Sequence, residues 1–169
     1  MTSRRHLVLV RHAKAEPFAA TDHARELTDR GRREAAAAGS YLKERDVVPD
    51  HAVVSSAART RATWDVMEQT MGSGATVVHD DSVYAGSTDV VLEVLRLVPD
   101  EARSVVFVGH QPAVGYLAHL LDDGAGDHEA LHRMLHGFPT ASMAVFEVEV
   151  PWADLAAECG RLVDFRPGG

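Results

Sequence analysis

Short apolar runs alternate with helical patterns along the chain, and this alternation constrains the fold more than any other feature. Strands are predicted at 6–10, 51–56, 75–80, 103–110 and 141–150, with a last edge strand within 151–165. Helices are predicted at 27–46, 57–71, 87–98, 112–123 and 127–137. Because strands and helices follow one another in this way, we expect an α/β fold. The specific prediction is a three-layer α/β/α sandwich with a mostly parallel central sheet.

The C-terminal part of the chain departs from this pattern. Residues 141–150 alternate apolar and polar side chains, so this strand should have one wetter face or pair antiparallel. We therefore expect an antiparallel C-terminal edge on the sheet. The 169 residues fit a single domain, 1–169, that is long enough to build a substantial core.

Local signals mark where several of the helices begin and end. Thr28 is a suitable N-cap for the first helix, and Ser87 or Thr88 for the third. The "GSG" stretch at 72–74 ends the second helix, and Pro112 suits the first turn of the fourth.

Charge and composition exclude several classes of partner. The formal net charge of −8 argues against nucleic acid, because a phosphate backbone requires a basic protein face. No apolar run approaches the roughly 20 residues of a membrane span, and no signal peptide is indicated. We therefore expect a cytoplasmic protein with no membrane partner. The single cysteine, Cys159, cannot form an internal disulfide and is interpreted as a small, partly buried apolar residue.

Three of the predicted strands are followed directly by arginine or histidine. Arg11 and His12 follow the first strand, Arg59 begins the helix after the second, and His110 follows the strand at 103–110. In open α/β sheets ligands bind at the carboxyl ends of the strands, so we expect these four side chains to meet. Helix N-termini at that edge add N–H donors and partial positive charge.

This combination predicts a pocket for a tetrahedral anion, and the expected anion is a phosphoryl group. The planar fork of arginine offers two parallel hydrogen bonds to such an anion. One histidine could attack phosphorus, since neutral imidazole is a nucleophile and neighbouring positive charge lowers its pKa. The other histidine is better suited to stabilising negative charge, as a cation or as an N–H donor.

Four segments resemble the histidine phosphatase superfamily, also called phosphoglycerate mutase-like. The segment "LVRHAKAE" is similar to the family's signature strand and loop, with Ala13 where glycine is commoner. The segments "LTDRGRREA", "SSAARTRATW" and "VVFVGHQPAVGYLAHLL" are similar to its other motifs, in the family's order. The "RHAKAEP", "VGHQP" and "FPTASMAVFEVE" segments resemble its SixA-type branch of phosphohistidine phosphatases.

The resemblance implies a role for each residue at the predicted edge. His12 would be the nucleophile that becomes phosphorylated, and Arg11, Arg59 and His110 would form the phosphate pocket. The implied reaction has two steps, phosphoryl transfer to histidine and then hydrolysis by water, with no metal and no organic cofactor. The implied partner is a protein that carries phosphohistidine, or else a small phosphate compound.

The proton donor that ester-cleaving members of the family use has no clear counterpart here. In those members a carboxylic acid follows the third strand, where this chain has Asp80, Asp81 and Asp89 outside any convincing motif. An alkoxide leaving group needs such a proton, whereas a phosphorylated imidazole needs it less. The sequence therefore favours phosphohistidine substrates. A broad or small-molecule phosphomonoesterase and a non-catalytic phosphate-binding module remain as alternatives.

Other polar residues are assigned weaker roles. His128, His132 and His136 lie at helical spacing, but without an "HExxH" motif we interpret them as a solvated helix face rather than a metal site. Lys14 could steer an anion toward the pocket. Asp22 and Arg25 could pair on the loop before the first helix, and we assign them no catalytic role.

Overall fold

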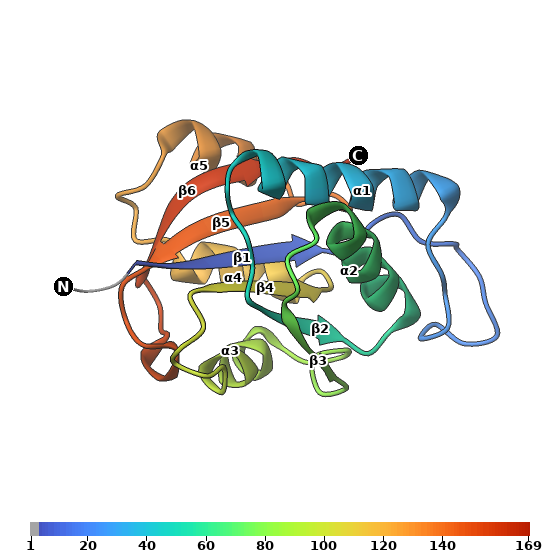
Figure 1. Ribbon diagram of the computed structural model, residues 1–169, viewed down its shortest axis with the longest axis horizontal. Coiled ribbons are helices and arrows are strands. Elements are labelled where there is room, and N and C mark those ends of the chain that lie inside the picture. Colours follow the sequence, from blue (N-terminus) through green and yellow to red (C-terminus); the bar gives the residue numbers. More distant parts are fainter. Residues whose placement is uncertain (1–3) are drawn as a thin grey trace.

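Residues 4–169, the part of the chain that the computed structural model describes, form a six-stranded sheet flanked by helices (Figure 1). The strand order is β3-β2-β4-β1-β5-β6. The strands are β1 (Arg5–Arg11), β2 (His51–Ser55), β3 (Thr76–Asp80), β4 (Ser104–Gly109), β5 (Met143–Val148) and β6 (Gly160–Arg166).

The sheet is parallel on one side of β1 and antiparallel on the other. β1 pairs in parallel with β4, β4 with β2 and β2 with β3. β5 pairs antiparallel with both β1 and β6, which confirms the predicted antiparallel C-terminal edge. β5 is nearly all buried, so the alternative prediction of a wetter face is wrong.

Helices cover both faces of the sheet, which confirms the predicted three-layer sandwich. α1 (Asp29–Glu44) and α2 (Ala58–Met71) pack side by side against one face, in front of the strands in Figure 1. α3 (Thr88–Arg96), α4 (Ala113–Leu121) and α5 (His128–Leu135) cover the other face. β1 supplies both cores because successive side chains of a strand alternate: Val8 and Val10 face α1 and α2, and Leu7 and Leu9 face the opposite helices.

The ends of the helices follow the local signals in most cases. The Thr28 side chain accepts a hydrogen bond from the Gly31 backbone N–H at 2.9 Å, as a capping residue should. Gly72 ends α2 in the left-handed conformation, at φ 62°. Ser87 precedes α3 without a capping hydrogen bond, and Pro112 lies at the N-cap position of α4, one residue earlier than predicted.

The topology brings three carboxyl-terminal strand ends together. β4 lies between β1 and β2, and all three strands run in the same direction, so their carboxyl ends share one edge (Figure 1). A short 3-10 turn, Trp152–Asp154, lies between β5 and β6. None of the helices within residues 4–169 is both long and apolar enough to cross a membrane.

Candidate active site

The carboxyl edge of β1, β4 and β2 holds the four residues predicted to meet. Arg11 is the last residue of β1 and His12 follows it; Arg59 is the second residue of α2; His110 directly follows β4. The His12 and His110 rings lie 5.4 Å apart between centroids. Nη2 of Arg59 lies 3.4 Å from Nδ1 of His110. The structure therefore brings the predicted residues into one cluster.

The His12 ring is oriented by its own loop. Its Nδ1 lies 2.8 Å from the carbonyl oxygen of Ala13, which can only accept, so Nδ1 carries the proton. The lone pair of the neutral ring is then on Nε2. The backbone of this segment is also held, because the His12 N–H donates to Gly109 O at 3.0 Å and the Ala13 N–H donates to Thr63 Oγ1 at 3.0 Å.

The site keeps His12 neutral. Burial, together with the smaller effect of the charges of Arg59 and Arg11, lowers the pKa of His12 to about 4, although the hydrogen bond to Ala13 opposes the shift. The residue is only 9% exposed. We expected neighbouring positive charge to cause this shift, but removal of the ring from water is the larger cause.

His110 is also neutral, and both of its nitrogens are engaged. Burial, followed by the charge of Arg59, lowers its pKa to about 3. Nη2 of Arg59 donates toward Nδ1, and Nε2 lies 2.8 Å from the hydroxyl of Ser55 on β2. Of the two forms considered from the sequence, a cation or an N–H donor, the structure of the free protein has the neutral N–H donor.

The two arginines are fixed in different ways. Nη1 of Arg11 donates to the carbonyl oxygen of Phe138 at 3.0 Å, beyond α5. Nη1 and Nη2 of Arg59 donate to the backbone oxygen and the carboxylate of Asp22, at 2.8 and 3.2 Å. Within residues 4–169 the Nε–H groups of both arginines are buried without a hydrogen-bond partner. Buried guanidinium N–H groups of this kind are suited to an oxyanion.

Asp22 and Tyr84 belong to this cluster, although the sequence assigned neither of them to it. The Tyr84 hydroxyl donates to Oδ2 of Asp22 at 2.6 Å, and the Tyr84 ring packs edge-on against His110 with centroids 5.6 Å apart. Arg25 Nε donates to Oδ1 of Asp22 at 2.9 Å, which confirms the predicted pairing of these two residues. The predicted pairing with Arg25 was the one sequence feature that pointed to Asp22. The distance along the sequence between residues 22 and 59 could not show that Arg59 also donates to this carboxylate.

The acids in the segment after β3 lie elsewhere. Oδ1 of Asp80 accepts the Ser82 N–H at 2.8 Å in a local turn, and Asp89 lies in the first turn of α3. Within the part of the chain that the structure describes, no hydrogen bond or ion pair joins the side-chain carboxylates of Asp80, Asp81 or Asp89 to the cluster, although the Tyr84 N–H donates to the backbone oxygen of Asp81 at 3.2 Å. The carboxylate whose charge acts on His110 is that of Asp22.

The remaining candidates are not part of the cluster. The rings of His132 and His136 lie 4.5 Å apart, but Nδ1 of His136 bonds to the His132 carbonyl oxygen. No group of three His, Cys, Asp or Glu side chains within residues 4–169 is arranged to hold a metal. The side chain of Lys14 is exposed, and its steering of an anion stays a prediction.

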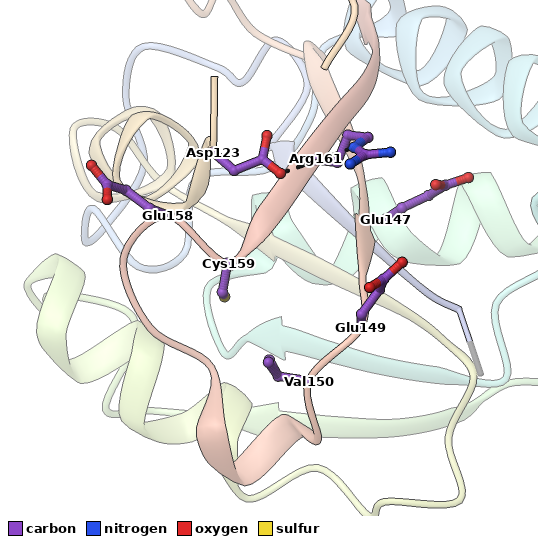
Figure 2. Close-up of a pocket in the computed structure, with 7 residues that line it drawn as sticks. All are labelled: Asp123, Glu147, Glu149, Val150, Glu158, Cys159 and Arg161. Carbon is purple, nitrogen blue, oxygen red and sulfur yellow. Dashed lines mark ion pairs between the residues drawn. The ribbon is translucent and has the colours of Figure 1, made fainter. Parts of the chain in front are cut away.

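A separate concavity of about 320 Å³ lies at the opposite end of the sheet (Figure 2). Its lining is acidic, and its single arginine, Arg161, pairs with Asp123 at 4.0 Å. Glu147 in this lining pairs in register with His6 at the start of β1, far from Arg11 at its end. Carboxylates repel a phosphoryl group, so this concavity does not compete with the cluster as an anion site.

Comparisons with known proteins agree with this arrangement. Residues 7–83 match the family model described as histidine phosphatase superfamily (branch 1). The uncharacterized protein Rv1276c of Mycobacterium tuberculosis (strain ATCC 25618 / H37Rv) is 35% identical over 159 residues. That match covers 93% of this chain and 98% of the relative.

Two solved structures extend the likeness to the fold. A SixA protein from Nakamurella multipartitia, provisionally described as a phosphohistidine phosphatase, is 34% identical with a TM-score of 0.86, covering 98% of this chain and 96% of the other. A SixA protein from Agrobacterium tumefaciens, with the same provisional description, is 29% identical with a TM-score of 0.78, covering 98% of both chains. With its strand order, its motifs and these relatives taken together, the chain belongs to the histidine phosphatase superfamily, in its SixA-type branch.

Proposed function

We propose that this protein is a phosphatase that forms a covalent phosphohistidine on His12. One observation carries the proposal: a neutral His12, with its proton held on Nδ1 by Ala13, stands in a cluster with Arg59 and His110. Arg11 and Arg59 would bind the non-bridging oxygens of the phosphoryl group. His110 would donate its Nε2–H to the same group, in place of the Ser55 hydroxyl, as charge develops on it.

The proposed reaction has two displacements at phosphorus. In the first, the Nε2 lone pair of His12 forms a bond to phosphorus, and the bond to the leaving group breaks with its electron pair going to that group. In the second, water attacks phosphorus and Nε2 departs with the P–N electron pair, while the water proton passes to the phosphate released. In both steps the two arginines would neutralise the negative charge on the non-bridging oxygens of the phosphoryl group. The proposed chemistry therefore uses no metal and no organic cofactor.

Phosphohistidine on a partner protein is the substrate that suits this site best. The carboxylates of Asp80, Asp81 and Asp89 make no hydrogen bond or ion pair with the cluster within residues 4–169. The pKa of Asp22 is lowered by its hydrogen bonds with Tyr84 and Arg25, so Asp22 is ionised and has no proton to give. A site without a carboxylic acid is poorly suited to alkoxide departure, whereas the nitrogen of a phosphoramidate is readily protonated from water. The SixA descriptions of the two solved relatives point to the same substrate class.

The test is the mass of the intact protein after brief mixing with a phosphohistidine peptide and a quench without acid. Wild type should gain one phosphoryl group transiently, and His12→Ala should not. His128→Ala, which alters an exposed histidine outside the cluster, is the matched control and should behave as wild type. Peptide turnover should be unchanged by a chelator.

An aryl phosphate ester in the same assay separates the candidate substrates. Turnover of the ester as fast as the peptide would replace the phosphohistidine assignment with a broad phosphomonoesterase. If wild type gains no mass and clears neither substrate, the protein is not a phosphatase for these classes, and a phosphate-binding module becomes the better description.

A further inference from the structure

The carboxylate of Asp22 lies at the centre of a network that reaches three different segments of the chain. It accepts hydrogen bonds from Arg25 on its own loop, from Arg59 on α2 and from Tyr84 after β3. The side chain of Asp22 is 57% exposed, whereas that of Arg59 is only 7% exposed. Asp22 is thus a carboxylate at the protein surface that forms an ion pair with the buried guanidinium of Arg59.

The loop that carries Asp22 is itself docked on α2. Ala57, at the N-cap of α2, makes no side-chain capping bond, and the N–H of Ala58 donates instead to the His23 carbonyl oxygen at 3.0 Å. The His23 ring bonds through Nε2 to the Ser56 hydroxyl at 2.9 Å and packs against Tyr84 at 4.8 Å. Arg25 ties the loop back to the carbonyl oxygen of Glu16 at 2.9 Å. These contacts fix residue 22 beside Arg59.

Part of the hydrogen-bonding capacity of Arg59 is unused in the structure. Residue 22 accepts one hydrogen bond from each terminal nitrogen of the guanidinium, and the Nε–H remains buried without a hydrogen-bond partner within residues 4–169. Guanidinium has five N–H donors in a rigid plane, so one edge can be held while another binds an anion. Through Tyr84 the same carboxylate sets the position of a ring that packs against His110.

We propose that Asp22 is a positioning residue, which aligns Arg59 and Tyr84 so that the phosphoryl pocket is already built before substrate binds. This inference rests on the proposed function, because it assigns Asp22 to the same reaction. Asp22 touches neither the attacking nitrogen nor the phosphorus in this role. It acts through Arg59 on the bound oxygens and through Tyr84 on His110.

The sign of the effect on anion affinity tests the proposal. Removing a negative charge beside an anion site should tighten anion binding if charge alone matters. Losing the alignment of Arg59 should weaken it. Asp22→Ala and Asp22→Asn remove the same charge, but the asparagine oxygen can still accept from Arg59 or Tyr84. A comparison of the two variants therefore separates alignment from charge.

The experiment measures the inhibition constant of tungstate, a phosphate-sized dianion, together with kcat and KM for the phosphohistidine peptide. Relative to Asp22→Asn, Asp22→Ala should raise the tungstate constant at least about fivefold and lower kcat/KM at least about tenfold. Tyr84→Phe should give a smaller loss. The double variant Asp22→Ala/Tyr84→Phe should lose less than the two single losses multiplied together, because the residues act as a unit.

Failure of the positioning role of Asp22 can be distinguished from failure of the proposed phosphatase activity. Asp81→Asn removes an exposed carboxylate after β3 and should leave every constant at the wild-type value. Asp22→Ala with wild-type or tighter tungstate binding, in a protein that melts like wild type, would overturn the positioning role. If wild type itself turns over no peptide, the proposed function fails, whereas direct titration with tungstate still decides whether Asp22 aligns the anion site.

Discussion

At the scale of the residue, the proposed role of His12 as nucleophile depends on which ring nitrogen carries its proton. The carbonyl oxygen of Ala13 selects the tautomer of His12 that leaves the Nε2 lone pair free. Burial then keeps the ring neutral far below the ordinary range of histidine. A histidine in solution is partly protonated near pH 6.5, and the protonated fraction cannot attack phosphorus. The site therefore keeps the proposed nucleophile in its neutral, reactive form over a wider range of pH.

The pKa shifts of the two histidines predict a specific titration. The ring resonances of His12 and His110 in the free protein, assigned from His12→Ala and His110→Ala, should not move between pH 7 and 5. Their pKa values, about 4 and about 3, lie below that range because burial disfavours the charged rings. Free histidine in the same buffer is the reference. A midpoint near 6.5 for His12 would show that the ring is solvated and would contradict the described geometry.

Residue identities at the site were predictable where they depend on position along a strand. Arg11, His12, Arg59 and His110 all lie at or just past the ends of buried parallel strands, and parallel strands end at a common edge. Asp22 could not be found in this way. Its place depends on hydrogen bonds from three segments, and no periodicity in the loop encodes them.

At the scale of the element, the start of α1 packs closely against the backbone of Lys14, in the loop that follows His12. The Lys14 carbonyl oxygen accepts from the backbone N–H and the hydroxyl of Thr28, at 3.0 and 3.2 Å. Gly31, in the first turn of α1, lies so near that a Cβ would stand 2.0 Å from the same oxygen. The glycine of the "LTDRG" segment is therefore required for α1 to pack this closely against Lys14, which lies two residues beyond His12.

Gly31→Ala should destabilise the protein and reduce its activity. Inserting a methyl group against backbone that cannot retreat costs about 1–3 kcal/mol, and each kcal/mol lowers the Tm of a chain of this size by about 2–4 °C. Displacement of Lys14 would also shift His12, so kcat should fall. Differential scanning calorimetry and peptide turnover measure the two effects. Arg32→Ala, at an exposed position in the same turn, should change neither, and a Gly31→Ala protein with wild-type Tm would contradict the close contact.

At the scale of the whole molecule, charge is separated along the strands. The carboxyl edge of the parallel strands gathers Arg11, Arg25 and Arg59, while the concavity at the other end gathers four carboxylates (Figure 2). The net charge of −8 argues against a nucleic-acid partner, but it carries no information about this separation. The distribution of charge depends on which strand ends lie at the same edge of the sheet. The alternation of strands and helices was enough to predict that the carboxyl ends of the parallel strands share one edge.

The buried histidines also determine how the folded state responds to acid. Their pKa values are lowered in the folded protein, most strongly for His12 and His110 and in the same direction for His51. In the unfolded chain each returns to about 6.5. Between pH 6.5 and about 4 the unfolded chain therefore binds protons that the folded protein does not, so the free energy of unfolding must fall as the pH falls.

Urea unfolding at pH 7, 6, 5 and 4.5 should show this loss, to which His12 contributes at most about 1.4 kcal/mol per pH unit. The double variant His12→Ala/His110→Ala should lose stability less steeply over the same range, whatever its stability at pH 7. His128→Ala, which changes an exposed histidine, should keep the wild-type slope. Asp22 does not affect this comparison. A carboxylate whose pKa is lowered in the folded protein loses its contribution to the free energy of unfolding only when the pH falls below its ordinary pKa of 3.8, which is outside the range measured. A double variant with the wild-type slope would place the acid sensitivity elsewhere in the molecule and would mean that the site histidines are not buried in their neutral form.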